Sequence, residues 1–299
     1  MPIGHWFLAL AAVSVWGTNF VVIAWGLAQL PPLLFCTLRF VLTSLPWIFF
    51  VKRPAASWKS IIGFGMLIGL GQFGLLYFAM HRYITPGLAS LLVQAQVLFT
   101  ILLSLTVKKQ RIGALQALAL AIALLGIAIV VWQSATGTTH LVTLFGVLLV
   151  LGSALSWAIA NLVVQSTGKV NVVAFLIWSS AFAIVPLLML TALIDGTWRS
   201  LHALASADFI AWASVAYQAF GNTFFAYGTW NWLLARHPAA TVAPTALLVP
   251  VVAMSSSAWL LAEPLPAWKI AAASLVLIGL AANAYASSRA PSAFQSNKD

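Results

Sequence analysis

Residues 113–142 read GALQALALAIALLGIAIVVWQSATGTTHLV. The first twenty of them are apolar or small except for Gln116, whereas the ten from Gln133 onwards are mostly polar. A helix needs about 20 mostly apolar residues to cross the hydrocarbon core of a bilayer. Residues 113–132 are therefore expected to cross a membrane, and residues 133–142 to form a polar linker near the middle of the chain.

The composition of the whole chain points the same way. Its 299 residues are 63% hydrophobic and 6% charged, with a mean hydropathy of +1.03. Soluble domains carry about 25% charged residues. The 6% found in this chain is too few to cover the surface of a water-soluble protein of this size. The net charge of +10 reflects a shortage of carboxylates, so no nucleic-acid partner is expected. Strands of a barrel would be about half as long and would alternate, so we predict an all-α integral membrane protein.

Ten stretches have the length and character of a spanning helix. They are residues 5–26, 33–51, 60–80, 86–106, 113–132, 143–165, 171–193, 209–232, 239–261 and 267–287. Division at the polar linker leaves five spans on each side. An odd number per half turns the second half upside down relative to the first, which is an inverted repeat. We predict a first repeat at 1–132 (spans 1–5), an outer linker at 133–142, a second repeat at 143–288 (spans 6–10) and a cytoplasmic tail at 289–299.

Residue pairs at nearly constant spacing support the repeat. Shifts of 140 to 142 residues superpose similar positions of the two halves. The pairs are Trp16 with Trp157, Asn19 with Asn161, Phe35 with Phe175, and Pro46 with Pro186.

The basic residues set the orientation. Lys and Arg accumulate on the cytoplasmic side of membrane proteins. With a cytoplasmic N-terminus, that side holds Lys52, Arg53, Lys59, Lys108, Lys109, Arg111, Lys169, Arg236, Arg289 and Lys298, and the outer side holds Arg82, Arg199 and Lys269. Both termini are therefore expected in the cytoplasm, and Arg39 alone lies within a span.

Two motifs carry a family resemblance. Residues 14–20 read SVWGTNF in the first span, and Pro250-Val251 is followed by Glu263-Pro-Leu. The chain resembles the EamA-type ten-helix exporters of the drug/metabolite transporter superfamily, and its aromatic content is similar to that of the YddG-type aromatic amino-acid exporters. The first half departs from the repeat, with Gln96-Val97 where Pro-Val is usual and Lys109 where Glu is usual. The resemblance implies a multi-pass protein of the bacterial inner membrane.

Polar side chains inside the spans are the candidates for a binding site. They are costly in a bilayer, so their placement is informative. Amides and hydroxyls beside aromatic rings suit a zwitterion with an apolar side chain. Hydrogen bonds between packed helices are the alternative explanation. The candidate substrate-binding residues are Trp16, Asn19, Arg39, Gln72, Tyr77, Gln94, Gln96, Trp157, Asn161, Tyr217 and Asn222.

Arg39 allows two interpretations. It lies inside the second span, about 9 Å from the outer end at 1.5 Å per helical residue. Either it receives the carboxylate of a substrate, or its role is structural and it extends outward to the interface or binds helix carbonyls.

These observations favour an exporter of amino acids, both aromatic and other largely neutral ones, that works by alternating access. Facilitated rather than proton-coupled transport is expected, because the acidic residues lie outside the spans or at their edges. An exporter of drugs, organic cations or other small metabolites is the alternative. We expect no enzyme, since no nucleophile and base or metal cluster is visible. No cofactor and no metal are expected, and Cys36 is the sole cysteine. The expected partners are a small-molecule substrate and the lipid bilayer; the oligomeric state stays open, and a monomer is plausible.

Overall fold

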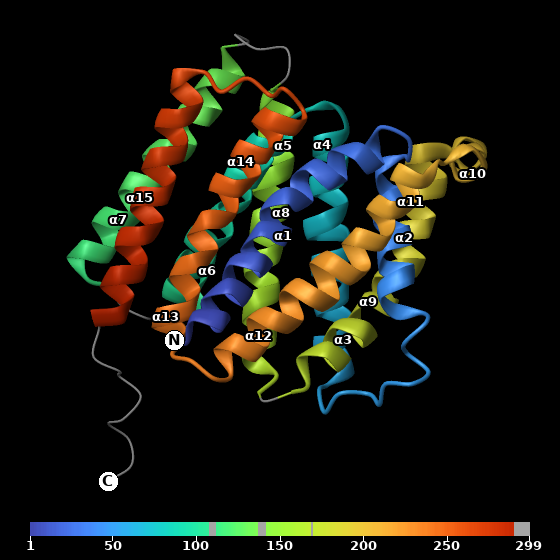
Figure 1. Ribbon diagram of the computed structural model, residues 1–299, viewed down its shortest axis with the longest axis horizontal. Coiled ribbons are helices and arrows are strands. Elements are labelled where there is room, and N and C mark those ends of the chain that lie inside the picture. Colours follow the sequence, from blue (N-terminus) through green and yellow to red (C-terminus); the bar gives the residue numbers. More distant parts are fainter. Residues whose placement is uncertain (108–111, 137–141, 169, 290–299) are drawn as a thin grey trace.

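The computed structural model describes residues 1–107, 112–136, 142–168 and 170–289, and every regular element in these ranges is helical (Figure 1). The N-terminal half contains α1 (Ile3–Leu27), α2 (Pro32–Ser44), α3 (Trp58–Met66), η1 (Leu67–Gly74), α4 (Leu75–Arg82), α5 (Pro86–Val93), α6 (Ala95–Val107) and α7 (Ala114–Ala135). The C-terminal half contains α8 (Leu144–Ser166), α9 (Val172–Leu190), η2 (Thr191–Gly196), α10 (Thr197–Ser206), α11 (Phe209–Ala216), η3 (Tyr217–Tyr227), α12 (Gly228–Leu234), α13 (Ala239–Val242), η4 (Ala243–Leu247), α14 (Leu248–Leu260) and α15 (Ala267–Arg289).

Several sequence predictions fall outside the described ranges. They concern residues 137–141 of the predicted linker, the basic residues Lys108, Lys109, Arg111, Lys169 and Lys298, and the predicted tail beyond Arg289.

Within the described ranges, eight helical segments are long and apolar enough to cross a membrane. They are Ile3–Leu27, Trp58–Arg82, Pro86–Thr106, Ala114–Ala135, Leu144–Ser166, Val172–Ser206, Ala243–Leu260 and Ala267–Ser287. Each overlaps one of the predicted spans. The prediction of an all-α membrane protein is therefore confirmed, and the two other predicted spans differ from expectation.

The second predicted span is shorter than expected. Residues 33–51 were expected to cross the membrane, but α2 ends at Ser44 after 13 residues, and turns follow as far as Phe50. Pro46 has no N–H to donate, so the series of helical hydrogen bonds is interrupted there although Leu45 still has helical backbone angles. The helix therefore ends just before this proline.

The eighth predicted span is helical but not among the eight apolar ones. Helical structure continues from Phe209 to Leu234 through α11, η3 and α12. Its central turns carry Gln218, Asn222 and Thr223, which are buried. These polar side chains lower the hydropathy of the segment while its backbone stays helical.

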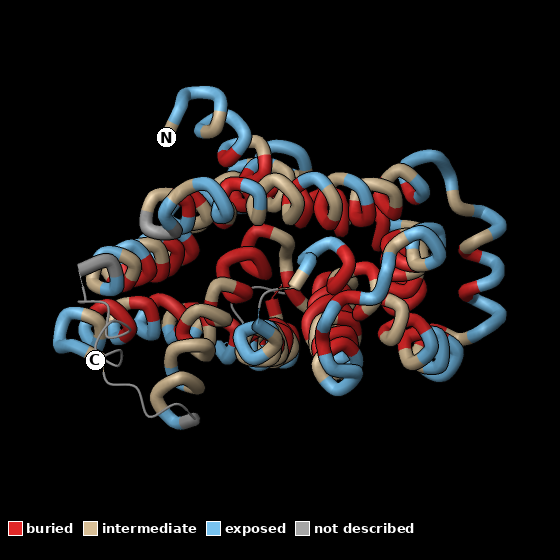
Figure 2. Tube along the Cα trace, turned by 90° about the horizontal axis from the view of Figure 1, so that it is seen from below, coloured by how far each residue is buried: buried red, intermediate tan, exposed pale blue. Residues whose placement is uncertain are grey.

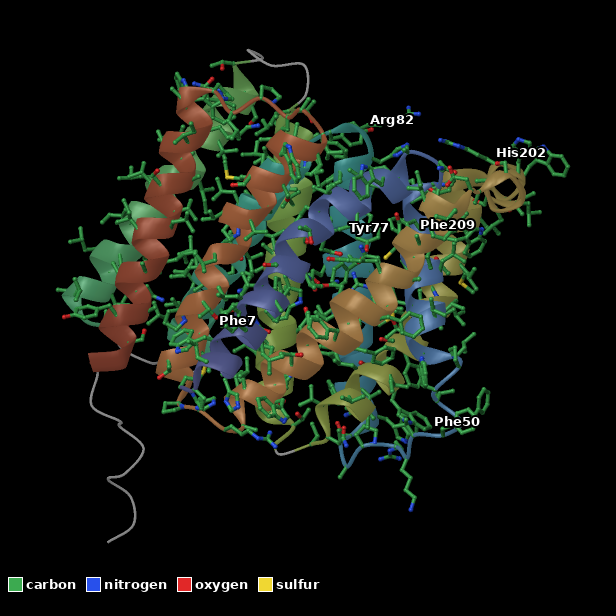
Figure 3. The ribbon with its side chains drawn as sticks, viewed as in Figure 1. Phe7, Phe50, Tyr77, Arg82, His202 and Phe209 are labelled. Atoms are coloured by element: carbon green, nitrogen blue, oxygen red, sulfur yellow. The ribbon has the colours of Figure 1, made fainter. Side chains whose placement is uncertain are left out.

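The burial pattern separates an inner face from an outer one on most helices (Figure 2). Large apolar side chains stand on the outer faces, among them Phe7 at 68% exposed and Phe50 and Phe209 at 84% (Figure 3). So much exposed apolar surface would be unstable in water. Against lipid tails it needs no cover, which agrees with a membrane protein.

Helices α7 and α15 lie side by side and form one flank of the bundle, at the left of Figure 1. Glycines let their backbones approach, because a Cβ at Gly279 would lie 2.6 Å from the Ala119 carbonyl oxygen and from the Ala123 nitrogen. Small residues at such crossings are typical of helix packing in membranes.

We therefore expect Gly279→Ala to destabilise the protein by about 1–3 kcal/mol, the usual cost of overpacking. Gly63→Ala is the matched control, because a Cβ at Gly63 meets nothing within 4 Å. There the higher helix propensity of alanine is expected to leave stability unchanged or raise it by up to about 1 kcal/mol. Thermal unfolding of the two purified variants measures the difference. Equal melting temperatures would contradict this account of the α7–α15 contact.

Candidate functional site

A cavity of about 590 Å³ lies between the two halves of the chain. Trp16 of α1, Arg39 of α2 and Gln72 of η1 line it from the first half, and Trp157 of α8 and Asn222 of η3 from the second. Its walls thus combine aromatic rings, amides and one guanidinium. A volume of this size suits a small organic molecule.

Most of the predicted site residues line this cavity. Those that do are Trp16, Asn19, Arg39, Gln72, Gln94, Gln96, Trp157, Asn161 and Asn222. The sequence-matched pairs Trp16 with Trp157 and Asn19 with Asn161 are among them. The structure therefore places both members of each sequence-matched pair around one cavity.

Two predicted residues lie outside the lining. The Tyr217 hydroxyl donates to the Val15 carbonyl at 3.0 Å and lies 2.8 Å from the Thr18 hydroxyl, so it links η3 to α1. Tyr77 is fully buried inside the bundle (Figure 3), and its hydroxyl accepts a hydrogen bond from Arg39 at 3.2 Å. Tyr77 therefore helps to position Arg39 without itself lining the cavity, and Tyr217 holds two helices together.

The Arg39 side chain does not extend outward to the interface. It is 3% exposed, and the residue lines the cavity. Nη1 donates to the Gln218 side-chain oxygen at 3.1 Å, and Nη2 to the Thr223 hydroxyl at 3.4 Å. The Phe73 ring lies 3.6 Å from Cζ, a cation–π contact. All of these partners are neutral, so none of them supplies a counter-charge to the guanidinium.

Amide side chains join helices across the cavity wall. The Gln218 amide donates to Asn19 Oδ1 at 2.6 Å, which connects η3 to α1. The Asn161 amide donates to Gln96 Oε1 at 3.0 Å, which connects α8 to α6. The expectation that such polar residues hydrogen-bond between helices therefore holds for both pairs, and three of the four residues, Asn19, Gln96 and Asn161, also line the cavity.

Trp16, Tyr227 and Trp230 form an aromatic wall of the cavity, which the sequence did not predict. The Trp16 ring lies 5.2 Å from the Tyr227 ring and 5.1 Å from the Trp230 ring, and all three residues line the cavity. Tyr227 and Trp230 flank the end of η3, a π-helical stretch with i→i+5 hydrogen bonds. The polar and aromatic sequence of that span indicated a functional role. The α-helical period of 3.6 residues, however, does not predict which side chains of a π-helix face the cavity.

Three buried polar atoms on lining residues have no hydrogen-bond partner among the described residues. They are Trp16 Nε1, Thr43 Oγ1 and Gln72 Oε1. Buried polar atoms in native proteins are nearly always hydrogen-bonded, so such atoms call for an explanation. All three atoms belong to residues that line the cavity, so their unused hydrogen-bonding capacity lies close to it.

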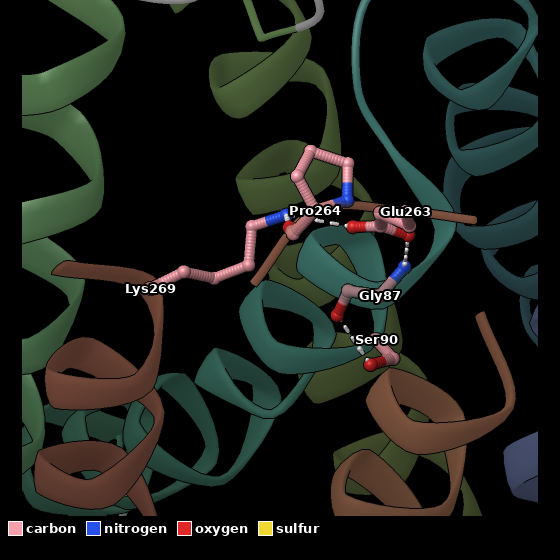
Figure 4. Close-up of polar contacts among 5 residues, drawn as sticks. All are labelled: Gly87, Ser90, Glu263, Pro264 and Lys269. Carbon is pink, nitrogen blue, oxygen red and sulfur yellow. Dashed lines mark hydrogen bonds and ion pairs between the residues drawn. The ribbon is translucent and has the colours of Figure 1, made fainter. Parts of the chain in front are cut away.

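The three described acidic residues are engaged elsewhere. Asp195 accepts from the backbone N–H groups of Leu33 and Leu34, both at 2.9 Å, and so caps α2. Glu263 accepts from the Gly87 N–H at 2.8 Å and pairs with Lys269 at 2.8 Å (Figure 4). Both carboxylates are thus used at helix N-termini.

Asp208 is exposed and caps α11. Its carboxylate accepts a hydrogen bond from the Ala211 N–H, which lowers the pKa of the Asp208 carboxyl. The cap therefore stays ionised at neutral pH.

The comparisons with known proteins decide the family. The model of the EamA-like transporter family matches residues 3–132 and 144–285. The chain belongs to this family. EamA-like proteins are membrane transporters of the drug/metabolite transporter superfamily, so the resemblance noted in the sequence is confirmed.

Relatives of this EamA-like transporter cover nearly its whole length. Proteins of Salmonella typhimurium and Escherichia coli K12, each named a probable amino-acid metabolite efflux pump, are 38% identical over 93% of this chain and 94% of their own. An uncharacterized transporter of Bacillus subtilis is 27% identical over 94% of this chain and 96% of its own. A crystal structure with a TM-score of 0.59 and 16% identity covers 97% of this chain and 100% of its own, which shows a shared fold.

Proposed function

We propose that this EamA-like transporter exports amino acids, both aromatic and other largely neutral ones. The substrate occupies the cavity between the two halves. Its carboxylate pairs with Arg39, and its side chain lies against Trp16, Tyr227 and Trp230. Two relatives at 38% identity are named amino-acid metabolite efflux pumps, which supports the direction and the substrate class.

The observation that carries the proposal is the environment of Arg39. A guanidinium that is 3% exposed and has only neutral partners retains a strong preference for an anion. A carboxylate matches its fork of donors and forms charge-assisted hydrogen bonds. The unpartnered Trp16 Nε1 adds a further donor on the same cavity wall.

The same observation disfavours the alternative, an exporter of organic cations. A cation in the cavity would meet the charge of Arg39, and the described lining residues contain no carboxylate to compensate it. Like charges in a site of low dielectric constant repel strongly. A drug or cation exporter would need an acid where this chain has Asn19 or Gln72.

Alternating access between two inverted repeats is the mechanism that we propose, with the repeats at 1–132 and 143–288 and the outer linker between them. Contacts between the halves support it, because α1 packs on α14 and α6 packs on α8. Exchange of the two repeats converts the first of these contacts into the second. A second hollow of about 380 Å³ shares Gln96, Asn161 and Asn283 with the cavity and extends it along α6 and α15.

Both termini are proposed to face the cytoplasm of a bacterial cell, with the protein in the inner membrane. The N-terminus and the described end of α15 lie at one end of the bundle, together with the α2–α3 connection that carries Lys52 and Arg53 and the start of α3 that carries Lys59 (Figure 1). Reporter fusions test the orientation. A fusion at Asn297 is expected to report cytoplasmic exposure and one at Gly137 outer exposure, and a cytoplasmic signal at Gly137 would contradict the inverted repeat.

Transport is proposed to be facilitative. Proton-coupled carriers use an ionisable residue whose pKa is tuned within the site. The described cavity lining contains no Asp, Glu or His. Purified protein in sealed liposomes is therefore expected to exchange labelled phenylalanine for unlabelled phenylalanine without a pH difference. Flux that appears only with an imposed proton gradient, and loses that dependence on substitution of Glu263 or His81, would refute the proposal.

A further inference from the structure

We infer that the cavity recognises a carboxylate but not an α-amino group, so that amphipathic organic monoanions, such as deaminated or N-acylated amino acids, bind at least as well as the amino acids themselves. The inference rests on the proposed function, because it concerns the same cavity. It goes further by naming which half of the zwitterion the protein reads.

The first argument is the charge of the site. Arg39 is the one charged side chain among the described residues that line the cavity. The whole chain has four acidic residues. Asp195 and Glu263 cap the helices α2 and α5, Asp208 caps α11, and Asp299 lies beyond the described residues. The described lining thus carries one positive charge and complements a ligand with one negative charge.

The second argument concerns what an ammonium group would meet. Two lining amide oxygens already accept hydrogen bonds, Asn19 Oδ1 from Gln218 and Gln96 Oε1 from Asn161. Other acceptors remain on lining residues, among them the side-chain oxygens of Gln94, Asn161 and Asn222, but these groups and the rings of the aromatic wall are all neutral. An ammonium group that leaves water needs an ionic partner to recover the cost of its desolvation. Here it also lies in the field of the Arg39 guanidinium.

The remaining surface of the cavity favours an apolar body on the ligand. Trp16, Tyr227 and Trp230 line the cavity as packed aromatic rings, and Phe40 and Phe73 flank Arg39. A carboxylate that binds Arg39 therefore places the rest of its molecule against aromatic carbon. Replacement of the ammonium by hydrogen or by a neutral amide removes the cost of desolvating a charge. It breaks no ionic contact, because the described lining offers the ammonium none.

The test is a series of ligands that share one phenyl group. Binding to the purified full-length protein is measured by its thermal unfolding and by quenching of its tryptophan fluorescence. The ligands are L-phenylalanine, 3-phenylpropionate, N-acetyl-L-phenylalanine and the cationic L-phenylalaninamide. We expect 3-phenylpropionate to bind at least as tightly as phenylalanine. The amide is expected to bind about ten- to a hundredfold more weakly, which is the range of a lost charge-assisted contact. N-acetyl-L-phenylalanine is expected to bind within about tenfold of phenylalanine.

A pH series provides an independent readout on the same protein. Above the pKa of its amino group phenylalanine becomes a monoanion, so its affinity is expected to rise towards that of 3-phenylpropionate, whose own affinity stays constant. Failure of 3-phenylpropionate to bind where phenylalanine binds would overturn the inference and leave the proposed function standing. Binding of the acids without binding or transport of any amino acid would overturn the proposed function and leave the inference about the carboxylate standing.

Discussion

Replacement of Glu263 by glutamine is expected to lower the free energy of unfolding by about 3–5 kcal/mol, the range for breaking a buried ion pair by removing one partner. The side chains of Glu263 and Lys269 are each 3% exposed. After the substitution the Lys269 ammonium keeps the Pro264 carbonyl at 2.9 Å as its neutral partner and has no counter-charge (Figure 4). The melting temperature, followed by tryptophan fluorescence, is expected to fall by on the order of 10 °C.

Two variants control this experiment. Asp208→Asn changes an exposed acid that also caps a helix, and because asparagine caps equally well the expected loss is within about 0.5 kcal/mol. The double variant Glu263→Gln with Lys269→Met removes both charges and is expected to recover most of the loss, since replacement of a whole buried pair is often neutral. A Glu263→Gln protein as stable as the Asp208→Asn protein would show that water solvates the pair.

The spans were predictable because the bilayer sets a length, and twenty apolar residues are easily recognised in a sequence. The end of α2 was not. Pro46 and Pro186 occupy matched positions, yet α2 ends before Pro46 whereas α9 continues through Pro186 to Leu190. Helical stability in proteins comes mainly from packing. Ala183 and Leu187 are fully buried around Pro186, whereas residues 45–50 are largely exposed, so packing preserves one helix and not the other.

The candidate site was predictable where the polarity of a residue was decisive. A buried amide or guanidinium within an apolar helix is costly, so Asn19, Arg39 and Asn161 stood out, and all three line the cavity. Facing directions were not predictable across η3. Its hydrogen bonds span five residues, so the period of 3.6 residues that relates side chains in an α-helix fails there. Tyr217 consequently packs on α1, while Tyr227 faces the cavity.

Replacement of Arg39 by glutamine is expected to abolish carboxylate binding and to leave the ligand-free protein about as stable as before. The two effects are separable because Arg39 provides a positive charge for the ligand but forms no ion pair that stabilises the ligand-free protein. Its neighbours Tyr77, Gln218 and Thr223 are neutral, so loss of their hydrogen bonds is offset by relief of a buried charge without a counter-ion. Exchange of labelled phenylalanine in liposomes is expected to fall at least about a hundredfold, as for the loss of a charge-assisted bidentate contact.

The decisive readout is the shift that a ligand produces in the melting temperature. A ligand that binds the native state alone stabilises it by about 2.7 kcal/mol at a concentration of 100 Kd, so the wild-type protein is expected to melt at a higher temperature with substrate present. In the Arg39→Gln protein this shift is expected to vanish. Arg82→Gln is the matched control, because Arg82 ends α4 outside the cavity lining and its loss should preserve both the shift and the flux. A large fall in the melting temperature of ligand-free Arg39→Gln protein, with the ligand-induced shift retained, would assign Arg39 to the fold instead of the substrate.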